Sequence, residues 1–177
     1  LLGSSDDGRT RQGIDLVRDL HLVSQFSAVL PLVDGNRSID QIRSPAVSAC
    51  VALDGPGSIA ALAGVLQNST EPLGLRQHVA RELAGVGQSE ARAALATALV
   101  SAPERLAFEI ALGLANNDEG ATLLVDAVAA GKAPPALLTD WGMNLRLNGR
   151  QVPGLKERIA QLTASLPPAD ARLQALV

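Results

Sequence analysis

The strongest constraint on this chain is a helical phrase that occurs twice, at 76–99 and again at 105–128, so that Arg105 in the second copy matches Arg76 in the first. Apolar positions match at the same interval, for example Leu83 with Leu112. This interval accommodates two short helices and a turn, which is one helical hairpin. Because a single hairpin cannot bury its own apolar face, the repetition predicts that hairpins stack into an α-solenoid.

An earlier segment matches the same phrase in both of its helices. The four matches pair Val47 with Val79, Val51 with Leu83, Leu62 with Leu95, and Leu66 with Leu99. The interval is one residue longer in the second helix than in the first, and one additional residue in the turn accounts for this change. The sequence therefore predicts three hairpins.

The boundaries follow from glycine and proline clusters, of which 54–57, with the sequence Asp-Gly-Pro-Gly, is the strongest turn. Residues 1–10 are polar and glycine-rich and are expected to form a disordered leader. The chain is expected to continue as one domain over 11–177. Within it we expect hairpins at 45–67, 72–100 and 103–130, then a C-terminal cap at 134–177. Whether 1–43 belong to the repeats stays open at this point.

Composition agrees with an all-α fold. Hydrophobic residues make up 47% of the chain but aromatic residues only 2%, so the core must consist of Leu, Val, Ile and Ala. Such small side chains allow close packing of helices, which suits stacked helical layers. The fold expected for the chain is a HEAT/armadillo-like α-solenoid, a right-handed superhelix. Apolar residues in 106–114 alternate as in a strand, but the alanines and the Ser-x-x-Glu sequence at 101–104 favour a helix that begins there.

Several function classes are disfavoured by the bulk properties. The formal charge is −3 and the basic residues are scattered, so nucleic acid is not an expected partner. The arginines are expected to lie on solvated helix faces. No apolar run reaches the length of a membrane span, so no direct membrane insertion is expected. The chain has a single cysteine, Cys50, so an intramolecular disulfide cannot form. Cys50 is expected to be a small core residue.

No catalytic, cofactor or metal site is predicted. The sequence contains no recognisable pairing of a nucleophile with a base, no carboxylate dyad and no cluster of metal ligands. His78 and Glu82 are four residues apart and could share a helix face. They could hold a metal with two outside ligands, but an ion pair is the favoured interpretation.

Five residues are predicted to make protein contacts. Trp141 and Met143 lie in an irregular stretch, where the tryptophan is either an exposed anchor for a partner or a plug at the end of the solenoid. Ala93, Ala96 and Val100 stand where charged residues are expected on the outer side of a repeat's second helix. An apolar outer face indicates a neighbouring helix layer or domain.

The segment 162–174, with the sequence LTASLPPADARLQ, resembles a phrase found in large multidomain proteins of planctomycetes and their relatives. These are the membrane-bound dehydrogenases, also described as haem-binding C-x-x-C-H proteins. The region 76–131 looks like the HEAT repeats of that family, and 131–138 resembles its G-K-x-x-x-x-L-L step. In that family a β-propeller precedes the helical region and a c-type cytochrome domain follows it.

This resemblance implies a cell-envelope protein, periplasmic or otherwise extracytoplasmic, in which the helical region packs against neighbouring domains. The cytochrome and the propeller are then the expected partners, and a noncatalytic scaffold or spacer is the expected function. The haem site does not carry over, because the chain has one cysteine and no C-x-x-C-H. The alternative is a stand-alone HEAT-like module that binds another protein or a peptide.

Overall fold

The computed structural model describes residues 1–4, 6–34 and 40–166, and within them all regular secondary structure is helical. The ambiguous segment 106–114 lies inside a helix, so the all-α class is confirmed. The chain forms two compact units, Leu1–Ala98 (unit 1) and Leu99–Val177 (unit 2), which are described separately. The single domain expected over 11–177 stays a prediction.

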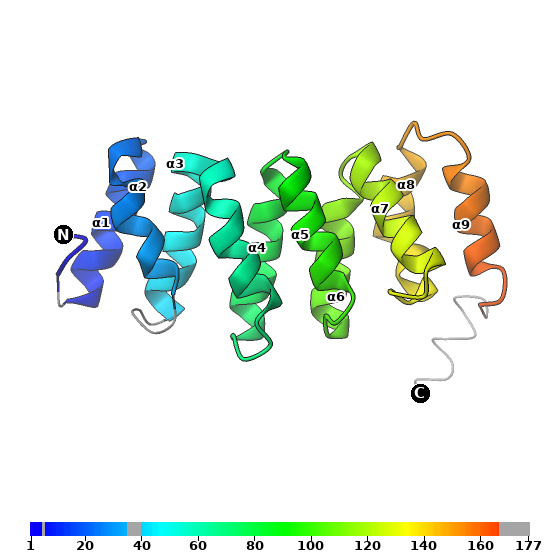
Figure 1. The fold of residues 1–177 in the computed structure, drawn as a ribbon, viewed down its shortest axis with the longest axis horizontal. Coiled ribbons are helices and arrows are strands. Elements are labelled where there is room, and N and C mark those ends of the chain that lie inside the picture. Colours follow the sequence, from blue (N-terminus) through cyan, green and yellow to red (C-terminus); the bar gives the residue numbers. More distant parts are fainter. Residues whose placement is uncertain (5, 35–39, 167–177) are drawn as a thin grey trace. The chain divides into compact units, whose positions relative to one another are not determined.

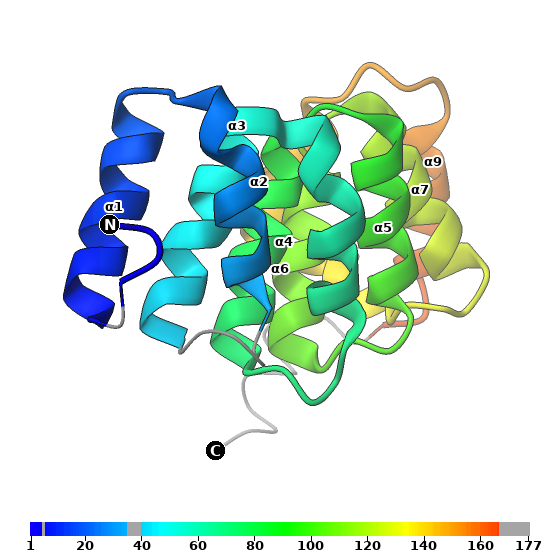
Figure 2. The ribbon, with the colours of Figure 1, turned by 60° about the vertical axis from the view of Figure 1, so that its left-hand side comes forward.

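Unit 1 consists of helical hairpins that follow one another along the chain (Figure 1). Helix α3 contacts α1, η2 and α4, so the middle hairpin packs against both its neighbours (Figure 2). The elements of unit 1 are α1 (Asp7–Asp19), η1 (Val23–Gln25), α2 (Phe26–Val29), η2 (Leu30–Val33), α3 (Asp40–Gln67), α4 (Leu73–Gly85) and α5 (Ser89–Leu99).

Helix α3 is itself a hairpin, because Asp54 interrupts it with non-helical backbone angles (φ −154°, ψ 84°). The Asp54 carboxylate accepts a hydrogen bond from the Gly57 amide at 2.9 Å and so caps the second half of α3. Pro56 lies in the first turn of that half, where its missing N–H costs nothing. The turn predicted at 54–57 is confirmed.

Burial in unit 1 repeats at one constant interval, the interval that separates Arg43 from Arg76, and we call this repeat the unit 1 register. The predicted first-helix matches of Val47 with Val79 and Val51 with Leu83 are therefore wrong by one residue, and no additional residue in the turn is needed. Helix α1 begins at Asp7 and buries Thr10, so the expected disordered leader at 1–10 is wrong in its second half. The first hairpin shares the register of the others, which the sequence had left open. The buried equivalents are Thr10, Arg43 and Arg76; Gly13, Ala46 and Val79; Ile14, Val47 and Ala80; Val17, Cys50 and Leu83; and, in the second helices, Val29, Leu62 and Leu95.

Two buried arginines join successive hairpins of unit 1. The Arg43 Nε donates to the Val33 carbonyl at 2.8 Å, and the Arg76 Nε donates to the Leu66 carbonyl at 2.8 Å. Both carbonyls lie at the end of the preceding hairpin's second helix, where the last backbone acceptors lack helical partners. We call these two contacts the inter-hairpin arginine bonds. They correct the expectation that the arginines lie on solvated faces, because both side chains are at most 5% exposed.

Unit 2 contains α6 (Glu104–Leu114), α7 (Asp118–Ala129), η3 (Pro135–Thr139), α8 (Trp141–Asn148) and α9 (Leu155–Thr163). Helix α6 begins where predicted, but its N-cap is Pro103 and no side chain caps it. The Ser-x-x-Glu capping box does not form because Glu104 is the first helical residue rather than the third. The terminal helix expected from 170 onwards lies outside the described residues.

The predicted match of 105–128 with 76–99 is wrong in register. Arg105, which the sequence paired with Arg76, is exposed, and Ala107 occupies the buried position instead. No arginine bond of the unit 1 type can form from an alanine. The observed buried equivalents are Leu75 and Leu106, Val79 and Ile110, and Leu83 and Leu114 in the first helices, and Ala91 and Ala121, Ala94 and Leu124, and Ala98 and Val128 in the second.

Helices α6 and α7 meet at a tight turn. The Asn117 side chain caps α7 by accepting from the Gly120 amide at 2.8 Å. A Cβ atom at Gly120 would overlap the Leu114 carbonyl oxygen. Helix α9 packs on α7, and the two are also joined by an ion pair between Arg158 and Asp126 at 2.5 Å.

Candidate functional site

Among the described residues, helix α8 packs on unit 2 through the face that carries Met143 and Leu147. The Asp140 carboxylate caps it, accepting from the amides of Gly142 at 2.8 Å and Met143 at 3.1 Å. Met143 and Leu147, one turn apart, are buried, and α8 contacts η3 and α6. Met143 was predicted as a contact residue, but at 0% exposure it belongs to the core.

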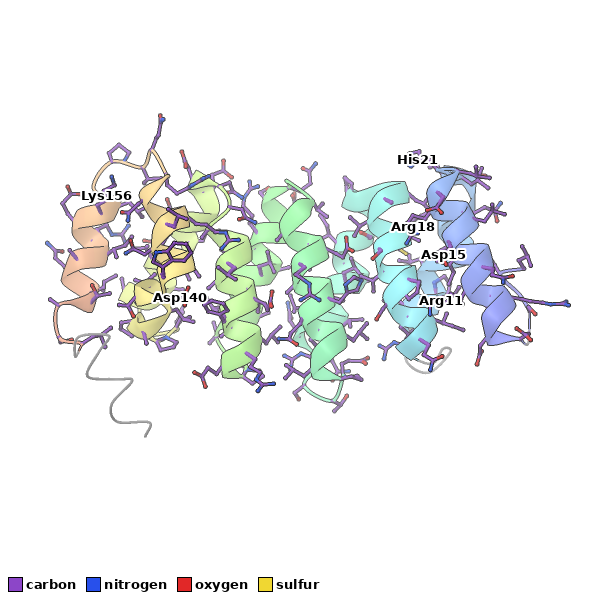
Figure 3. The ribbon with its side chains drawn as sticks, turned by 180° about the vertical axis from the view of Figure 1, so that it is seen from behind. Arg11, Asp15, Arg18, His21, Asp140 and Lys156 are labelled. Carbon is purple, nitrogen blue, oxygen red and sulfur yellow. The ribbon has the colours of Figure 1, made fainter. Side chains whose placement is uncertain are left out.

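The opposite face of α8 is apolar and exposed. Trp141 is 80% exposed and Leu145 is 63% exposed, and their spacing of four residues places them on one face. Figure 3 shows Asp140 at the start of this helix. We call Trp141 and Leu145 the α8 surface. Of the two interpretations left open for Trp141, the exposed one fits and the plug does not.

The other predicted contact residues differ in exposure. Val100 is 54% exposed, Ala93 is exposed and Ala96 is half-buried. Ala93 and Ala96 lie on α5, and Val100 follows its last residue. Their small side chains offer much less apolar area than the α8 surface does.

Unit 1 carries a polar groove of about 530 Å³. Figure 3 shows three of its charged side chains, Arg11, Asp15 and Arg18, along α1. Arg18 forms ion pairs with Asp15 at 3.5 Å and with Asp19 at 3.0 Å. The groove is lined by Arg11, Asp15, Arg18 and Asp19 of α1, Ser44, Pro45 and Ser48 of α3, and His78 of α4.

A serine, a histidine and a glutamate meet at this groove. The Ser48 hydroxyl donates to Glu82 Oε1 at 2.6 Å and lies 3.0 Å from His78 Nε2. The same nitrogen is 3.2 Å from the Ser44 carbonyl and 3.6 Å from Glu82 Oε1. The structure thus brings His78 and Glu82 together, as the ion-pair interpretation requires.

The geometry does not support nucleophilic catalysis by Ser48. In a catalytic triad the carboxylate bonds to the far nitrogen of the imidazole, and the near nitrogen accepts the serine proton. Here the Ser48 hydroxyl donates its hydrogen bond directly to Glu82 Oε1. His78 Nε2 faces a carbonyl and a carboxylate, neither of which can donate, so this nitrogen carries the proton. The three side chains form a polar contact between α3 and α4.

Cys50 is fully buried, and burial raises the pKa of its thiol to about 12. The thiolate is the reactive form of cysteine, so this residue is inert at neutral pH. The sequence-based prediction of a core cysteine is confirmed. Among the described residues, no group of three or more His, Cys, Asp or Glu side chains is placed to hold a metal ion.

In the described part of the chain one helix, Gln41–Gln67, is long and apolar enough to cross a membrane by length and composition alone. This segment lies within α3, which Asp54 divides. Each half is shorter than the roughly 20 residues that a helical span requires. The apolar character of the segment is accounted for by packing against α1, η2 and α4.

No family model, curated protein or solved structure matches this chain. The resemblance carried by 76–131 and 162–174 therefore stays a prediction. Sequence reasoning missed the two inter-hairpin arginine bonds. The signal that could have found them is the interval between Arg43 and Arg76, which is the same as the interval between Leu62 and Leu95 in the second helices.

Proposed function

We propose that the chain is a noncatalytic scaffold of HEAT/armadillo-like hairpins, an α-solenoid whose helical faces contact other proteins or domains. Two features of unit 1 support a solenoid. Burial follows the unit 1 register through three hairpins, and buried arginines at equivalent positions bond the second and third hairpins to the one before. Repeated units that contact only their neighbours are the defining property of solenoids.

The single observation that carries a contact function is the α8 surface. A solvent-exposed tryptophan has a large apolar area left in water, and tryptophan is enriched among the residues that dominate binding energy at protein interfaces. Leu145 extends the apolar area along the same face. Loss of such an anchor from an interface costs about 2–4 kcal/mol of binding energy.

The partner suggested by the family resemblance is a neighbouring domain of a longer cell-envelope redox protein, either a c-type cytochrome or a β-propeller. In that arrangement the scaffold spaces the two domains and performs no chemistry itself. The alternative is a stand-alone module that uses the same surface to bind a separate protein or a peptide. Both functions need Trp141 to become covered.

Site-specific photo-crosslinking in the natural protein tests this proposal. A photoreactive phenylalanine analogue replaces Trp141, and the matched control places it at Lys132, which is also exposed in unit 2. We expect one discrete adduct from position 141 that is absent from position 132. An adduct within the same polypeptide supports the spacer function, and an adduct to a second protein supports the stand-alone module. Equal or absent adducts at both positions would refute a contact function for the α8 surface.

Intrinsic fluorescence gives an independent readout. Trp141 is the only tryptophan and the chain has no tyrosine, so its emission reports on the α8 surface alone. In the isolated chain we expect red-shifted emission that acrylamide quenches readily. In complex with the crosslinked partner, prepared without tryptophan, we expect a blue shift and protection from acrylamide.

A further inference from the structure

The polar groove of unit 1 exists because the middle one of three neighbouring helices carries small residues. The floor of the groove is formed by Ser44, Pro45 and Ser48 of α3. In the unit 1 register the equivalents of Ser44 are Arg11 in α1 and Gln77 in α4, which have much longer side chains. The surface over α3 is therefore lower than the surface over its neighbours, and the depression holds about 530 Å³.

One wall of the groove carries opposite charge at its two ends. Along the side of α1 that borders the groove lie, in order, Arg11, Asp15 and Arg18 (Figure 3). Arg11 forms no ion pair with any residue that the structure describes, so its end of the groove is positive. At the other end Asp15 and Asp19 share the guanidinium of Arg18, at 3.5 and 3.0 Å. Two carboxylates against one guanidinium leave this end with one negative charge.

The spacing of the two ends matches that of side chains on an extended peptide. Arg11 and Asp19 are about two helical turns apart, which is about 12 Å along the axis of α1. An extended chain rises about 3.3 Å per residue, so side chains four residues apart lie on one face at a separation of about 13 Å. An acidic and a basic side chain at this spacing complement the charges at both ends of the wall.

The chemistry of the groove fits a peptide better than a small organic molecule. Pockets for small ligands are predominantly apolar and cover most of the ligand's surface. Here Pro45 is the only apolar lining residue, and Arg11 and Asp19 are exposed, so a bound ligand keeps one side in water. Such a ligand must gain its affinity from several separate polar contacts. The Ser44 hydroxyl on the floor can both donate to and accept from a peptide backbone.

We propose that the polar groove binds an extended peptide segment that carries an acidic and a basic side chain four residues apart. The acidic side chain pairs with Arg11, and the basic one pairs with Asp15 and Asp19. The site lies in unit 1 and does not depend on the contact function of the α8 surface. Exposed ion pairs contribute little each, so the dissociation constant is expected to be on the order of 100 μM and to rise with salt.

Titration of the ¹⁵N-labelled chain with a synthetic peptide, followed by amide chemical shifts, measures both the affinity and the site. The probe is an acetylated and amidated heptapeptide, Ser-Glu-Ser-Gly-Ser-Lys-Ser, and matched peptides carry Gln in place of Glu, of Lys or of both. We expect saturable shifts in α1 and the first half of α3, and a dissociation constant roughly 2–5-fold higher for each charge removed. Absence of saturable shifts, shifts outside the groove, or equal affinity of the four peptides would overturn the proposal.

Charge reversal on α1 tests the proposed ion pairs. Arg11→Glu is expected to raise the dissociation constant of the probe roughly 10-fold, and to bind a peptide with Lys at both charged positions more tightly than the original chain does. The matched control is Arg9→Glu, which makes the same charge change on the same helix outside the groove. That control is expected to change the dissociation constant less than about 2-fold. Equal effects of the two variants contradict the proposal.

A third variant tests the shape of the groove. Ser44→Gln gives α3 the residue that α4 carries at the equivalent position, Gln77, so the fold is expected to be kept. The dispersion of the amide spectrum checks this. The longer side chain fills the depression over α3, and the dissociation constant of the probe is expected to rise roughly 10-fold or more. An unchanged affinity in a folded Ser44→Gln variant would show that the peptide does not enter the groove.

Discussion

In unit 1 an arginine from each of two hairpins reaches back to the end of the preceding one, whereas in unit 2 the equivalent position holds Ala107. The contacts described in unit 2 are different in kind: Gly120 lies against the Leu114 carbonyl at the turn inside the α6–α7 hairpin, and an exposed ion pair joins Arg158 of α9 to Asp126 of α7. The difference shows two ways of joining successive helices. One satisfies the unpaired carbonyls at a helix end, and the other removes side-chain volume so that backbones can touch.

The largest expected loss of stability follows removal of an arginine from unit 1. Arg43→Ala is expected to lower the free energy of unfolding by about 3–5 kcal/mol, because it leaves the Glu71 carboxylate, 2.6 Å from Arg43 in the intact protein, without its buried partner. Urea denaturation followed by circular dichroism measures the loss. Addition of Glu71→Gln is expected to restore part of it by removing the uncompensated charge. Arg43→Ala with the stability of the wild-type chain would contradict this role.

For unit 2 the corresponding variant fills the close approach. Gly120→Ala is expected to cost up to about 3 kcal/mol, since its Cβ would overlap a backbone carbonyl that cannot move independently. The matched control is Gly64→Ala in the second half of α3, where a Cβ meets nothing within 4 Å. That control is expected to gain about 0.5–1 kcal/mol from reduced backbone entropy in the unfolded chain. Equal changes in stability for the two variants would show that the close approach at Gly120 does not exclude a side chain there.

The second arginine of unit 1, Arg76, tests the contribution of a single hydrogen bond between hairpins. Arg76→Ala is expected to cost about 1–2 kcal/mol, because the buried Leu66 carbonyl loses its donor. Arg105→Ala is the control from unit 2, and its exposed side chain predicts a change within about 0.5 kcal/mol. The repeat predicted from the sequence matches Arg105 with Arg76. Equal losses of stability from the two variants would therefore favour the predicted register over the observed one.

Local chemistry made much of the fold predictable. Glycine and proline clusters at 54–57 and 131–135 fixed turns that the structure contains, because these residues restrict the backbone without reference to the rest of the chain. Register was not predictable in the same way. Matching Arg76 with Arg105 follows residue identity, but a slip of two residues on a helix moves a side chain by about 200° and so to the opposite face.

The candidate site was less predictable than the fold, for a related reason. The burial of Arg43 depends on an acceptor that lies earlier in the chain, at the end of another hairpin. The exposure of Trp141 depends on which helices cover α8, and composition favours neither outcome for a lone tryptophan. Both are properties of packing between elements, and the periodicity of a single helix does not contain them.

The smallest expected effect concerns the turn inside each hairpin of unit 1, where His21, Asp54 and Gly87 occupy equivalent positions. His21 has a φ of 50° and Gly87 a φ of 34°, so both lie in the left-handed region that favours glycine. At His21 the turn is closed by hydrogen bonds from the Leu22 amide to the Val17 carbonyl at 2.9 Å and from the His21 amide to the Arg18 carbonyl at 3.0 Å.

His21→Gly is therefore expected to stabilise the protein by about 0.5–1 kcal/mol, as relief of the left-handed strain exceeds the added entropy of the unfolded chain. Gly87→Ala is expected to change stability in the opposite direction by a similar amount. Thermal denaturation of the two single variants and of the double variant measures both effects. Because the two positions belong to the first and third hairpins of unit 1, additive effects are expected, and the double variant should match the original chain. A loss of stability in His21→Gly would show that the imidazole makes a contact that outweighs the backbone strain.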